Sequence, residues 1–530
     1  MINENKIYVD KTDIIEKIIR LNRKYYFLSR PRRFGKSLLI STLKNIFKGN
    51  KELFKDTFIY DNYDWNESYP VIHLDMSDFE NSTIEELKRD LEDAIETIAD
   101  LNHISINKNI SLKRKFSTLI RNLSDSTNKR VVVLIDEYDK PLLDNIDNER
   151  ITIDIQKELR KFYGALKSSS SYLKLVFITG ISKFTKASIF SDLNNLKDLT
   201  LNRDYSTICG YTYNELEKYF EKFISHYANT TNISYEETIK KIKGYYDGYS
   251  WDGDNFLYNP YSIMNFFDDM EFKNYWFETG TPNFLVKIFK ENFNMNDVYN
   301  PIIKFEDDFA IFDITNLGQI PLLFQAGYLT ISKKELGYDG IRYTLKIPNF
   351  EVEKSITKNL FDNFYGKVEN NFRKNRNEIL DQIKEGNCEL LGKYLKKEII
   401  SIDYHLKIRN WKYYQSIILF AMKALNFNSE TKSEVAMFSG RMDIAIEDEN
   451  TYYPFNDAKG HVIIMEVKYT RQDKISVENL ADKAINQIKY KGYYEKYDKE
   501  NLIIVGLGIK EIELNVGSKI DLKCIIEKMN

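Results

Sequence analysis

Cysteine, histidine and proline are scarce in this chain of 530 residues, which contains three cysteines, five histidines and nine prolines. The cysteines, Cys209, Cys388 and Cys524, lie far apart and form no Cys-x-x-Cys pair. The sequence therefore predicts neither a disulfide framework nor a structural zinc site. The net charge of −3 also excludes an overall basic field, so any nucleic-acid binding must come from local patches.

Long apolar runs and an apolar leader are missing as well. The apolar runs, such as residues 131–135, have the length of strands and are far too short to span a membrane. Residues 1–6 are mostly polar and lack the apolar region of a signal peptide. We therefore expect a cytoplasmic protein with no membrane partner.

The first part of the chain, residues 1–210, alternates short apolar runs with amphipathic stretches, which predicts an α/β domain with a parallel sheet. The expected strands are Tyr25–Leu28, Val71–Leu74, Val131–Ile135, Leu175–Thr179 and Leu199–Leu201. Helices are expected near residues 36–48, 83–99, 111–123 and 151–167.

Residues 211–400 are expected to form a mainly helical lid. Within it, a helix at Ile320–Gln325 precedes two strands, at 328–331 and 343–347, and a further helix begins at Phe350. This order is compatible with a winged-helix-like module, and equally with a helix and hairpin that cover a site. Residues 401–530 predict a second α/β domain, with strands near 434–446, 462–468 and 502–507 and helices at 410–426 and 476–497.

The stretch that joins the first expected strand to the first expected helix carries the most specific signal, Arg30-Pro31-Arg32-Arg33-Phe34-Gly35-Lys36-Ser37. A loop that ends in Gly-Lys-Ser between a strand and a helix is the context of a P-loop. The backbone from Arg32 to Gly35 would wrap a polyphosphate, Lys36 would reach the terminal phosphates, and Ser37 would hold Mg²⁺. We therefore expect ATP and Mg²⁺ at this loop.

Arg30 occupies the place where the motif has glycine, so the loop must turn without it. The three arginines of the loop, Arg30, Arg32 and Arg33, either neutralise phosphate or serve the site of a neighbouring subunit in a homo-oligomer. The sequence is equally compatible with a solvated basic loop, or with Arg30 as a structural substitute for glycine.

The expected strand at residues 131–135 ends in two carboxylates, Asp136 and Glu137. In combination with an upstream P-loop, Asp136 is predicted to hold the Mg²⁺ and Glu137 to orient and deprotonate the attacking water. Acids that end a core strand for structural reasons are the alternative. Thr179, at the end of the next strand, is a candidate contact to the terminal phosphate, as is Ser182, although a strand-end threonine is as often a turn residue.

A second group of carboxylates lies in the C-terminal region. Asp443 follows a glycine turn on one expected strand, and Glu466 and Lys468 stand two residues apart on the next, so they share one face. Asp443 and Glu466 could hold Mg²⁺, or Mn²⁺ in its place, while Lys468 positions water and stabilises charge on a phosphate. Alternating charges on a solvated strand would look the same.

Further residues near this group are ambiguous. Glu434 is either an additional ligand or a surface acid. Because the expected helix at 410–426 has no acidic residue, a second metal ion is in doubt. Basic residues of the last helix either contact a phosphate backbone or only solvate the helix: Lys483, Lys489, Lys491 and Lys496.

With these motifs in place, the chain resembles the bacterial AAA-ATPase-like family whose members carry a C-terminal domain of the PD-(D/E)XK nuclease superfamily. Besides the P-loop, the resemblance rests on residues 8–12, 136–139, 179–183, 258–262, 275–281 and 327–331. It implies an AAA/ASCE-like P-loop NTPase sheet, ATP as ligand, and a nuclease-like core around Asp443, Glu466 and Lys468. It also implies that Arg30 is a variant shared by the family.

We expect an ATPase coupled to a metal-dependent nuclease that acts on DNA. The alternative is a nucleotide-switched DNA-binding or assembly protein whose nuclease-like domain does not cut. A nuclease whose N-terminal domain binds nucleotide without turnover is a weaker third interpretation.

Overall fold

We describe the fold from a computed structural model of the chain. The structure describes residues 7–276, apart from 22 and parts of 183–194, and then 302–305, 308, 319–360 without 339, 378–401, 414, 418, 422, 430–437, 440–447, 462–495, 502–513 and 518–528. For the strands at 430–437 and 440–447 it describes the backbone. These residues divide between two compact units, residues 1–287 with 303–353, and residues 288–302 with 354–530. The three-domain division at 210 and 400 stays a prediction.

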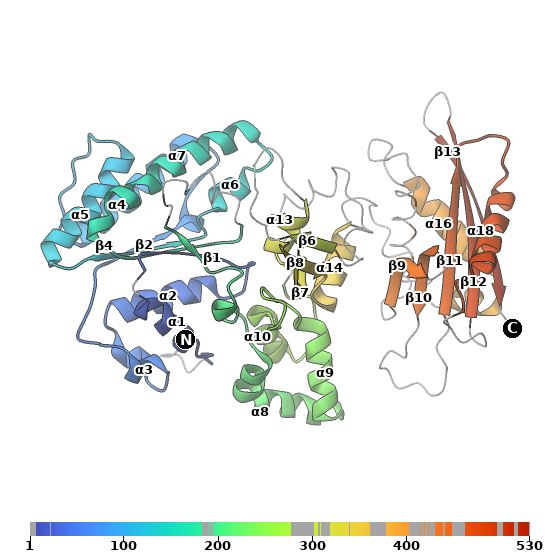
Figure 1. The fold of residues 1–530 in the computed structure, drawn as a ribbon, viewed down its shortest axis with the longest axis horizontal. Coiled ribbons are helices and arrows are strands. Elements are labelled where there is room, and N and C mark those ends of the chain that lie inside the picture. Colours follow the sequence, from blue (N-terminus) through green and yellow to red (C-terminus); the bar gives the residue numbers. More distant parts are fainter. Residues whose placement is uncertain are drawn as a thin grey trace. The chain divides into compact units, whose positions relative to one another are not determined.

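The first unit is built on a five-stranded sheet in the order β2-β3-β4-β1-β5, with every pair of neighbours parallel (Figure 1). Its strands are β1 (Tyr25–Ser29), β2 (Val71–Asp75), β3 (Val131–Asp136), β4 (Leu173–Gly180) and β5 (Lys197–Asp198). The first four confirm the expected strands. Strands β1, β3 and β4 are buried almost throughout, which explains their unbroken apolar sequences.

The expected fifth strand was misplaced by two residues. Leu199 N still donates to Phe27 O of β1 at 2.9 Å, but the ladder does not continue beyond it, because the polar groups of Thr200 are engaged elsewhere. Its hydroxyl accepts from Ser29 N at 3.1 Å, and its own N–H donates to Asp198 Oδ1 at 2.9 Å. A turn stabilised by side chains therefore replaces the last part of the strand.

Helices pack on both faces of this sheet, as α/β topology requires (Figure 1). The four expected helices are confirmed as α2 (Lys36–Phe47), α4 (Ile84–Leu101), α5 (Leu112–Thr127) and α7 (Glu149–Ser168). Shorter helices are α1 (Thr12–Arg20), α3 (Ile59–Asn62) and α6 (Lys140–Asp144). The core between the sheet and α4, α5 and α7 is aliphatic and aromatic, with Phe116 stacked on Phe162 at 4.6 Å.

The rest of the first unit is the lid, defined here as residues 205–276 and 319–353. Its helices are α8 (Tyr213–Thr231), α9 (Tyr235–Tyr246), α10 (Pro260–Asp269), α13 (Gln319–Gln325) and the beginning of α14 (Phe350–Leu360). A three-stranded sheet in the order β6-β8-β7 joins β6 (Ile302–Phe305) to the hairpin of β7 (Thr330–Gly337) and β8 (Gly340–Lys346). The expected helical character of the middle region is confirmed, and its helix and hairpin fit a winged-helix-like module and a helix-and-hairpin cover equally.

The second unit contains another five-stranded sheet, in the order β13-β12-β11-β10-β9. Its elements are β9 (Glu430–Met437), β10 (Gly440–Glu447), β11 (Val462–Thr470), α18 (Val477–Lys491), β12 (Leu502–Glu513) and β13 (Ser518–Lys528), with α16 (Glu389–Ser401) against β13. Only β11 and β12 pair in parallel, with α18 as their connection. The expected helix at 410–426 lies largely outside the described residues.

Among the helices that the structure describes, none combines the length and the apolar character that crossing a membrane demands.

Candidate active sites

The P-loop lies at the carboxyl edge of the first sheet, between β1 and α2. Two of its residues adopt left-handed backbone, Arg33 with φ of 67° and Gly35 with φ of 91°. A Cβ at Gly35 would meet no atom within 4 Å, so glycine is favoured there by backbone conformation and not by lack of space. Gly35 is also the N-cap of α2, so the N–H groups of the first turn of this helix face the loop.

The predicted phosphate-binding side chains occupy different environments. Lys36 is buried, with 4% of its surface exposed, and its Nζ donates to Pro31 O at 3.1 Å. Ser37 and Arg32 are exposed. Lys36 also acts electrostatically on Glu137, because its positive charge opposes the rise in the pKa of that carboxyl.

Arg30 is directed into the protein and is completely buried. Its Nη1 donates to Ser29 O at 2.8 Å and Thr200 O at 3.0 Å, and its Nη2 to Tyr205 O at 3.2 Å and Ser206 O at 3.4 Å. The guanidinium also lies over the Trp251 ring, 4.1 Å from its centroid. Burial lowers the pKa of Arg30 to about 10. Arg30 therefore organises the loop from beneath, and the alternative of a structural residue at this position is the one that the structure supports.

Arg33 and Phe34 attach the P-loop to the lid. The Arg33 Nη1 donates to Tyr275 O and, at 2.9 Å, to Trp276 O, and its guanidinium lies 3.9 Å from the Tyr261 ring centroid. Phe34 is fully buried and makes edge-on contacts with Tyr249 at 4.7 Å and Trp251 at 5.2 Å. A movement of the loop on ligand binding would therefore be transmitted to the lid through these contacts.

Asp136 ends β3, which is separated from the P-loop strand β1 by β4, and it is buried with 1% of its surface exposed. Its Oδ1 accepts from Glu137 N at 3.0 Å and from the Thr179 hydroxyl. Among the described residues, its Oδ2 has no hydrogen-bond partner, although it is buried. A buried carboxylate oxygen without a partner is costly unless a ligand such as a cation or its water satisfies it.

Glu137 has left-handed backbone, with φ of 48°, which is a strained conformation for a residue of this type. Burial raises the pKa of its carboxyl, while the charge of Lys36 acts in the opposite direction. A carboxyl with a raised pKa at the edge of a phosphate-binding loop is suited to accept a proton from water.

The sequence did not reveal the role of Asp139, three residues after Asp136. Asp139 is fully buried, and its carboxylate accepts from Ile181 N at 3.1 Å, Ser182 N at 2.6 Å and Ser182 Oγ at 2.6 Å. Burial raises its pKa, and these hydrogen bonds oppose the rise. Asp139 thus fixes the end of β4, as Asp136 does through Thr179. The hydroxyl groups of Thr179 and Ser182 both donate hydrogen bonds to carboxylates, and a phosphate contact by either stays a prediction.

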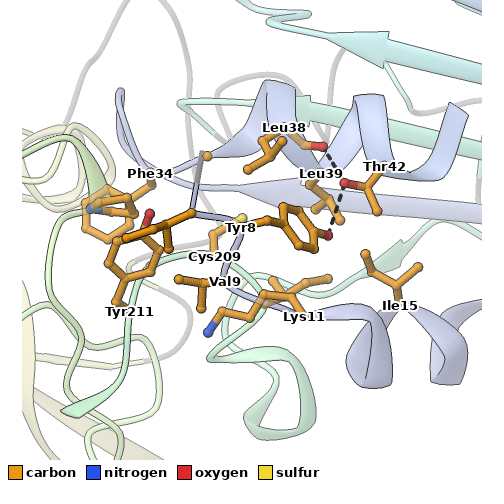
Figure 2. Close-up of a pocket in the computed structure, with 15 residues that line it drawn as sticks. Tyr8, Val9, Lys11, Ile15, Phe34, Leu38, Leu39, Thr42, Cys209 and Tyr211 are labelled. Atoms are coloured by element: carbon orange, nitrogen blue, oxygen red, sulfur yellow. Dashed lines mark hydrogen bonds between the residues drawn. The ribbon is translucent and has the colours of Figure 1, made fainter. Parts of the chain in front are cut away.

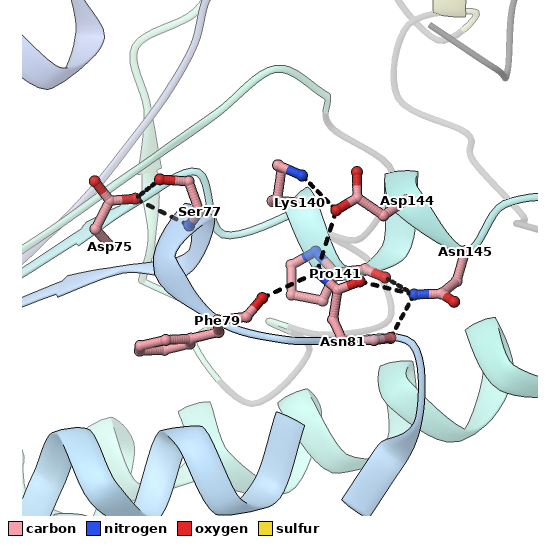
Figure 3. A network of polar contacts seen from close by, with 8 residues as sticks. All are labelled: Asp75, Ser77, Phe79, Asn81, Lys140, Pro141, Asp144 and Asn145. Atoms are coloured by element: carbon pink, nitrogen blue, oxygen red, sulfur yellow. Dashed lines mark hydrogen bonds and ion pairs between the residues drawn. The ribbon is translucent and has the colours of Figure 1, made fainter. Parts of the chain in front are cut away.

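A second polar network holds α6, the helix that follows Glu137 (Figure 3). Asn145 Nδ2 donates to Asn81 O at 2.7 Å and Pro141 O at 2.9 Å, and Asn81 Nδ2 donates to Asp144 Oδ2 at 3.1 Å. Asp75, opposite Asp136 in the sheet, accepts from Ser77 N at 3.0 Å. The segment after β2 is thereby tied to α6, which restrains the turn that carries Asp136 and Glu137.

A pocket opens beside Gly35, within the first unit (Figure 2). The side chains of Val9, Ile15 and Leu39 make its walls apolar, and Tyr8 and Thr42 face it with hydroxyl groups 3.4 Å apart. Tyr8, Val9 and Lys11 of the N-terminal segment line this pocket. Asp10 Oδ1 accepts from Thr12 N, at the start of α1, at 2.9 Å, and Lys11 pairs with Glu215 of the lid at 2.6 Å.

In the second unit, β11 carries Glu466 and Lys468 on one face, and Lys468 Nζ donates to Glu466 Oε1 at 2.7 Å. Glu466 is buried, with 2% of its surface exposed, and Gln487 of α18 also donates to its Oε1. The β10–β11 ladder pairs Ile444 with Met465, so one step further the backbone of Asp443 reaches the level of Glu466. The β9–β10 ladder likewise brings the backbone of Glu434 to the level of Asp443.

The remaining predictions at this site are not tested by the described residues. The structure gives only the backbone of Asp443 and Glu434, and Lys496 lies outside it. Lys489 pairs with Glu527, whereas Lys483 is exposed on α18. Within the part of the chain that the structure describes, no group of three or more His, Cys, Asp or Glu side chains is arranged to hold a metal.

Comparison with known proteins gives two family matches. A family described as "Predicted AAA-ATPase" matches residues 1–190, and one described as "PD-(D/E)XK nuclease superfamily" matches residues 409–519. A curated protein of Azotobacter chroococcum, described as "Uncharacterized protein in vnfD 5′ region", is 32% identical over 511 residues. That match covers 95% of this chain and 92% of the relative.

Among solved structures, the chain is similar to the Aeropyrum pernix ORC1 protein in complex with DNA, with 9% identity and a TM-score of 0.26. The match covers 66% of this chain and 93% of that one. It is also similar to Cdc6p from Pyrobaculum aerophilum, with 10% identity, a TM-score of 0.24 and the same two coverages.

Proposed function

Because this chain belongs to the predicted AAA-ATPase family and carries a C-terminal domain of the PD-(D/E)XK nuclease superfamily, we propose that it is an ATPase coupled to a Mg²⁺-dependent nuclease that hydrolyses DNA phosphodiester bonds. The observation that carries the first half is the convergence of Lys36, Asp136 and Glu137 at one edge of the first sheet. Strand β4 lies between β1 and β3, so the P-loop and the acidic strand end are separated by a single strand.

In this proposal the loop backbone from Arg32 to Gly35 and the Lys36 ammonium bind the phosphates of ATP. Ser37 and the Oδ2 of Asp136 hold the Mg²⁺, which neutralises phosphate charge when it is bound. Thr179 keeps Asp136 in position through its hydrogen bond to Oδ1. Glu137 orients the attacking water and accepts its proton, and burial helps because it raises the pKa of this carboxyl.

The pocket beside Gly35 is the site that we assign to the adenine ring. It adjoins the loop that would hold the phosphates, and its walls from Val9, Ile15 and Leu39 suit a flat, weakly polar ring. Tyr8 and Thr42 supply hydroxyl groups at its edge (Figure 2). Because Tyr211 and Cys209 of the lid also line the pocket, an adenine ring bound there would contact both parts of the unit.

For the nuclease half, the residues of β11 fit a hard cation. Glu466 offers a buried carboxylate whose Oε1 is fixed by Lys468 and Gln487, and the β10–β11 register brings the backbone of Asp443 alongside. Asp443 and Glu466 would hold Mg²⁺ or Mn²⁺, which polarises a phosphodiester when bound. Lys468 would position water and stabilise charge on the phosphate.

The ATPase is tested with two variants of the full chain. We expect Lys36→Ala to abolish binding of a fluorescent ATP analogue, because it removes the cation of the loop. Glu137→Gln should retain binding and lose hydrolysis by at least about a hundredfold, the usual contribution of a general base. Equal hydrolysis by wild type and Glu137→Gln would remove Glu137 from this role.

The nuclease is tested by cleavage of linear and circular DNA with Mg²⁺ or Mn²⁺. Cleavage should disappear in Asp443→Ala and in Glu466→Gln, whereas Glu478→Gln, a substitution of another acid in the same unit, should leave it unchanged. If the wild-type protein binds DNA without cutting it, the alternative of a nucleotide-switched DNA-binding or assembly protein replaces this half of the proposal.

A further inference from the structure

The hairpin of β7 and β8 belongs to the first unit, and the part of it next to the turn is exposed. Four consecutive residues of β7, Lys333 to Leu336, are exposed. Since successive side chains of a strand point to opposite faces, exposed side chains lie on both faces of this part of the hairpin. Closer to its base, Tyr343 and Leu345 of β8 are buried. The hairpin is therefore anchored at one end and free at the other.

The base of the hairpin is firmly held. Ser250 N donates to the Thr330 hydroxyl at 2.6 Å, and Ile331 N donates to Ser250 O at 3.3 Å. A Cβ at Gly253 would come within 2.9 Å of Lys334 N, so the backbones touch there. The segment that makes these contacts also carries Trp251, which packs on Arg30 and Phe34 of the P-loop.

The free end of the hairpin carries two large apolar side chains, and the acidic Asp339 follows them in the sequence. Leu336 has 86% of its surface exposed, and Tyr338 at the turn is fully exposed. Single exposed apolar residues are common, but two large ones at the exposed end of the hairpin form a contact surface. Both side chains are largely exposed among the described residues, so the packing that the structure describes does not require them.

The flanks of the hairpin are basic in a chain whose net charge is negative. Within residues 330–346 there are four cations, Lys333, Lys334, Arg342 and Lys346, all exposed, against two carboxylates, Glu335 and Asp339. One carboxylate, Glu335, pairs with Lys333 at 2.7 Å, but both side chains are more than half exposed, so the pair is weak and exchangeable. Exposed cations match the charge of a polyanion, and the apolar side chains beside them could enter a groove on its surface.

We propose that the β7–β8 hairpin binds double-stranded DNA, with Leu336 and Tyr338 entering the minor groove and the flanking cations contacting phosphates. Proteins that bind this groove insert apolar side chains at base steps and neutralise the adjacent backbone. The neighbouring helix α13 does not serve as a groove-reading helix, because residues 321–325 are buried. The inference rests on the proposed function for DNA as the target, and it assigns a contact of the first unit, separate from Asp443 and Glu466.

The test measures binding of a labelled duplex by the full-length protein in EDTA, so that cleavage does not interfere. We expect the double variant Leu336→Ala, Tyr338→Ala to bind at least about tenfold more weakly, the loss typical for one or two inserted side chains. Netropsin, a ligand of the minor groove, should compete with the wild-type protein. Leu101→Ala, which truncates a side chain that is 76% exposed on α4, is the matched control and should bind as the wild type does.

A second set of variants separates the contribution of the cations, which would contact phosphates, from that of the apolar side chains, which would enter the groove. Replacing Lys333, Lys334 and Arg342 by alanine should flatten the dependence of affinity on salt, by about one unit of slope per lost phosphate contact. Affinity of the Leu336→Ala, Tyr338→Ala variant equal to that of the Leu101→Ala control would overturn the proposal and leave the tip as a protein contact. Binding in EDTA is measured independently of cleavage. If the protein binds the duplex but never cuts DNA, the proposed nuclease activity is contradicted, whereas the proposed role of the hairpin is not.

Discussion

Arg30 occupies the position at which a phosphate-binding loop usually has glycine, and its side chain is buried in the core of the first unit. Four backbone carbonyls accept hydrogen bonds from its guanidinium, and Trp251 covers one face of it. The backbone at Arg30 is not left-handed, so no glycine is needed there, and the left-handed positions fall at Arg33 and Gly35. A basic residue in a P-loop is therefore not by itself a phosphate ligand.

The residue-scale prediction follows from this packing. Arg30→Gly, although it restores the usual motif, should destabilise the first unit by at least about 3 kcal/mol, because it leaves buried carbonyls without donors and opens a cavity. Thermal unfolding followed by circular dichroism measures the change. The matched control is Arg32→Ala, an exposed arginine of the same loop, for which we expect a change within about 0.5 kcal/mol. A stable Arg30→Gly variant with tighter ATP binding would contradict the structural role.

At the scale of elements, the P-loop and the lid are joined by a chain of contacts that ends in a buried acid. Arg33 donates to the carbonyls of Tyr275 and Trp276, and Trp276 N in turn donates to Glu351 Oε1 at 2.8 Å. Glu351, at the start of α14, also accepts from the Ser262 hydroxyl of α10 at 2.8 Å. Loop, α10 and α14 are thereby held by one side chain that is completely buried.

Burial raises the pKa of Glu351 to about 8 from its ordinary value of 4.5, and this gives an element-scale prediction. Between these two values the folded state holds a proton that the unfolded state releases. The free energy of unfolding should therefore fall as pH rises through this window and level off above about pH 8, by an amount on the order of a few kcal/mol.

Glu351→Gln tests this directly, because glutamine mimics the neutral carboxyl and does not titrate. The melting temperature of the wild type should decline from pH 5 to pH 8 more steeply than that of the variant. Glu353→Gln on the same helix is the control and should follow the wild type. Parallel pH profiles for wild type and Glu351→Gln would show that this carboxyl is already ionised in the folded protein.

Several elements could be predicted from sequence, and the exceptions have physical reasons. Helices α2, α4, α5 and α7 and strands β1 to β4 have strong apolar periodicity or unbroken apolar runs, and the prediction found them. The fifth strand was shifted because side-chain hydrogen bonds of Thr200 compete with the ladder. Strand β13 was missed, although Ile520, Leu522 and Cys524 alternate with polar residues at the period of a strand.

At the scale of the whole molecule, the two proposed sites lie in different compact units, each with its own apolar core. We therefore expect a substitution in one site to leave the proposed activity of the other unit in place. We predict that Glu466→Gln retains ATP hydrolysis within about a factor of two, because Glu466 belongs to the second unit and is held there by Lys468 and Gln487. Lys36→Ala should lose ATP hydrolysis but still cut DNA in the absence of nucleotide.

Both activities are measured on the same preparations, with malachite-green detection of phosphate and gel analysis of DNA. Comparison of cleavage with and without ATP then reports the coupling, which should vanish in Lys36→Ala. Simultaneous loss of both activities in a folded Glu466→Gln protein would show that the sites are not separable in this way.

The amino-acid sequence by itself determined the local chemistry of this protein: a Gly-Lys-Ser loop, an acidic strand end and a Glu-x-Lys strand. These are contiguous patterns, and their spacing reflects the periods of strands and helices. Only the tertiary structure decided that β4 separates β1 from β3, that Asp136 is held by Thr179 and Asp139 by Ser182, and that Arg30 faces the core. Strand order and the direction of a side chain depend on contacts between residues far apart in the chain, which no local pattern contains.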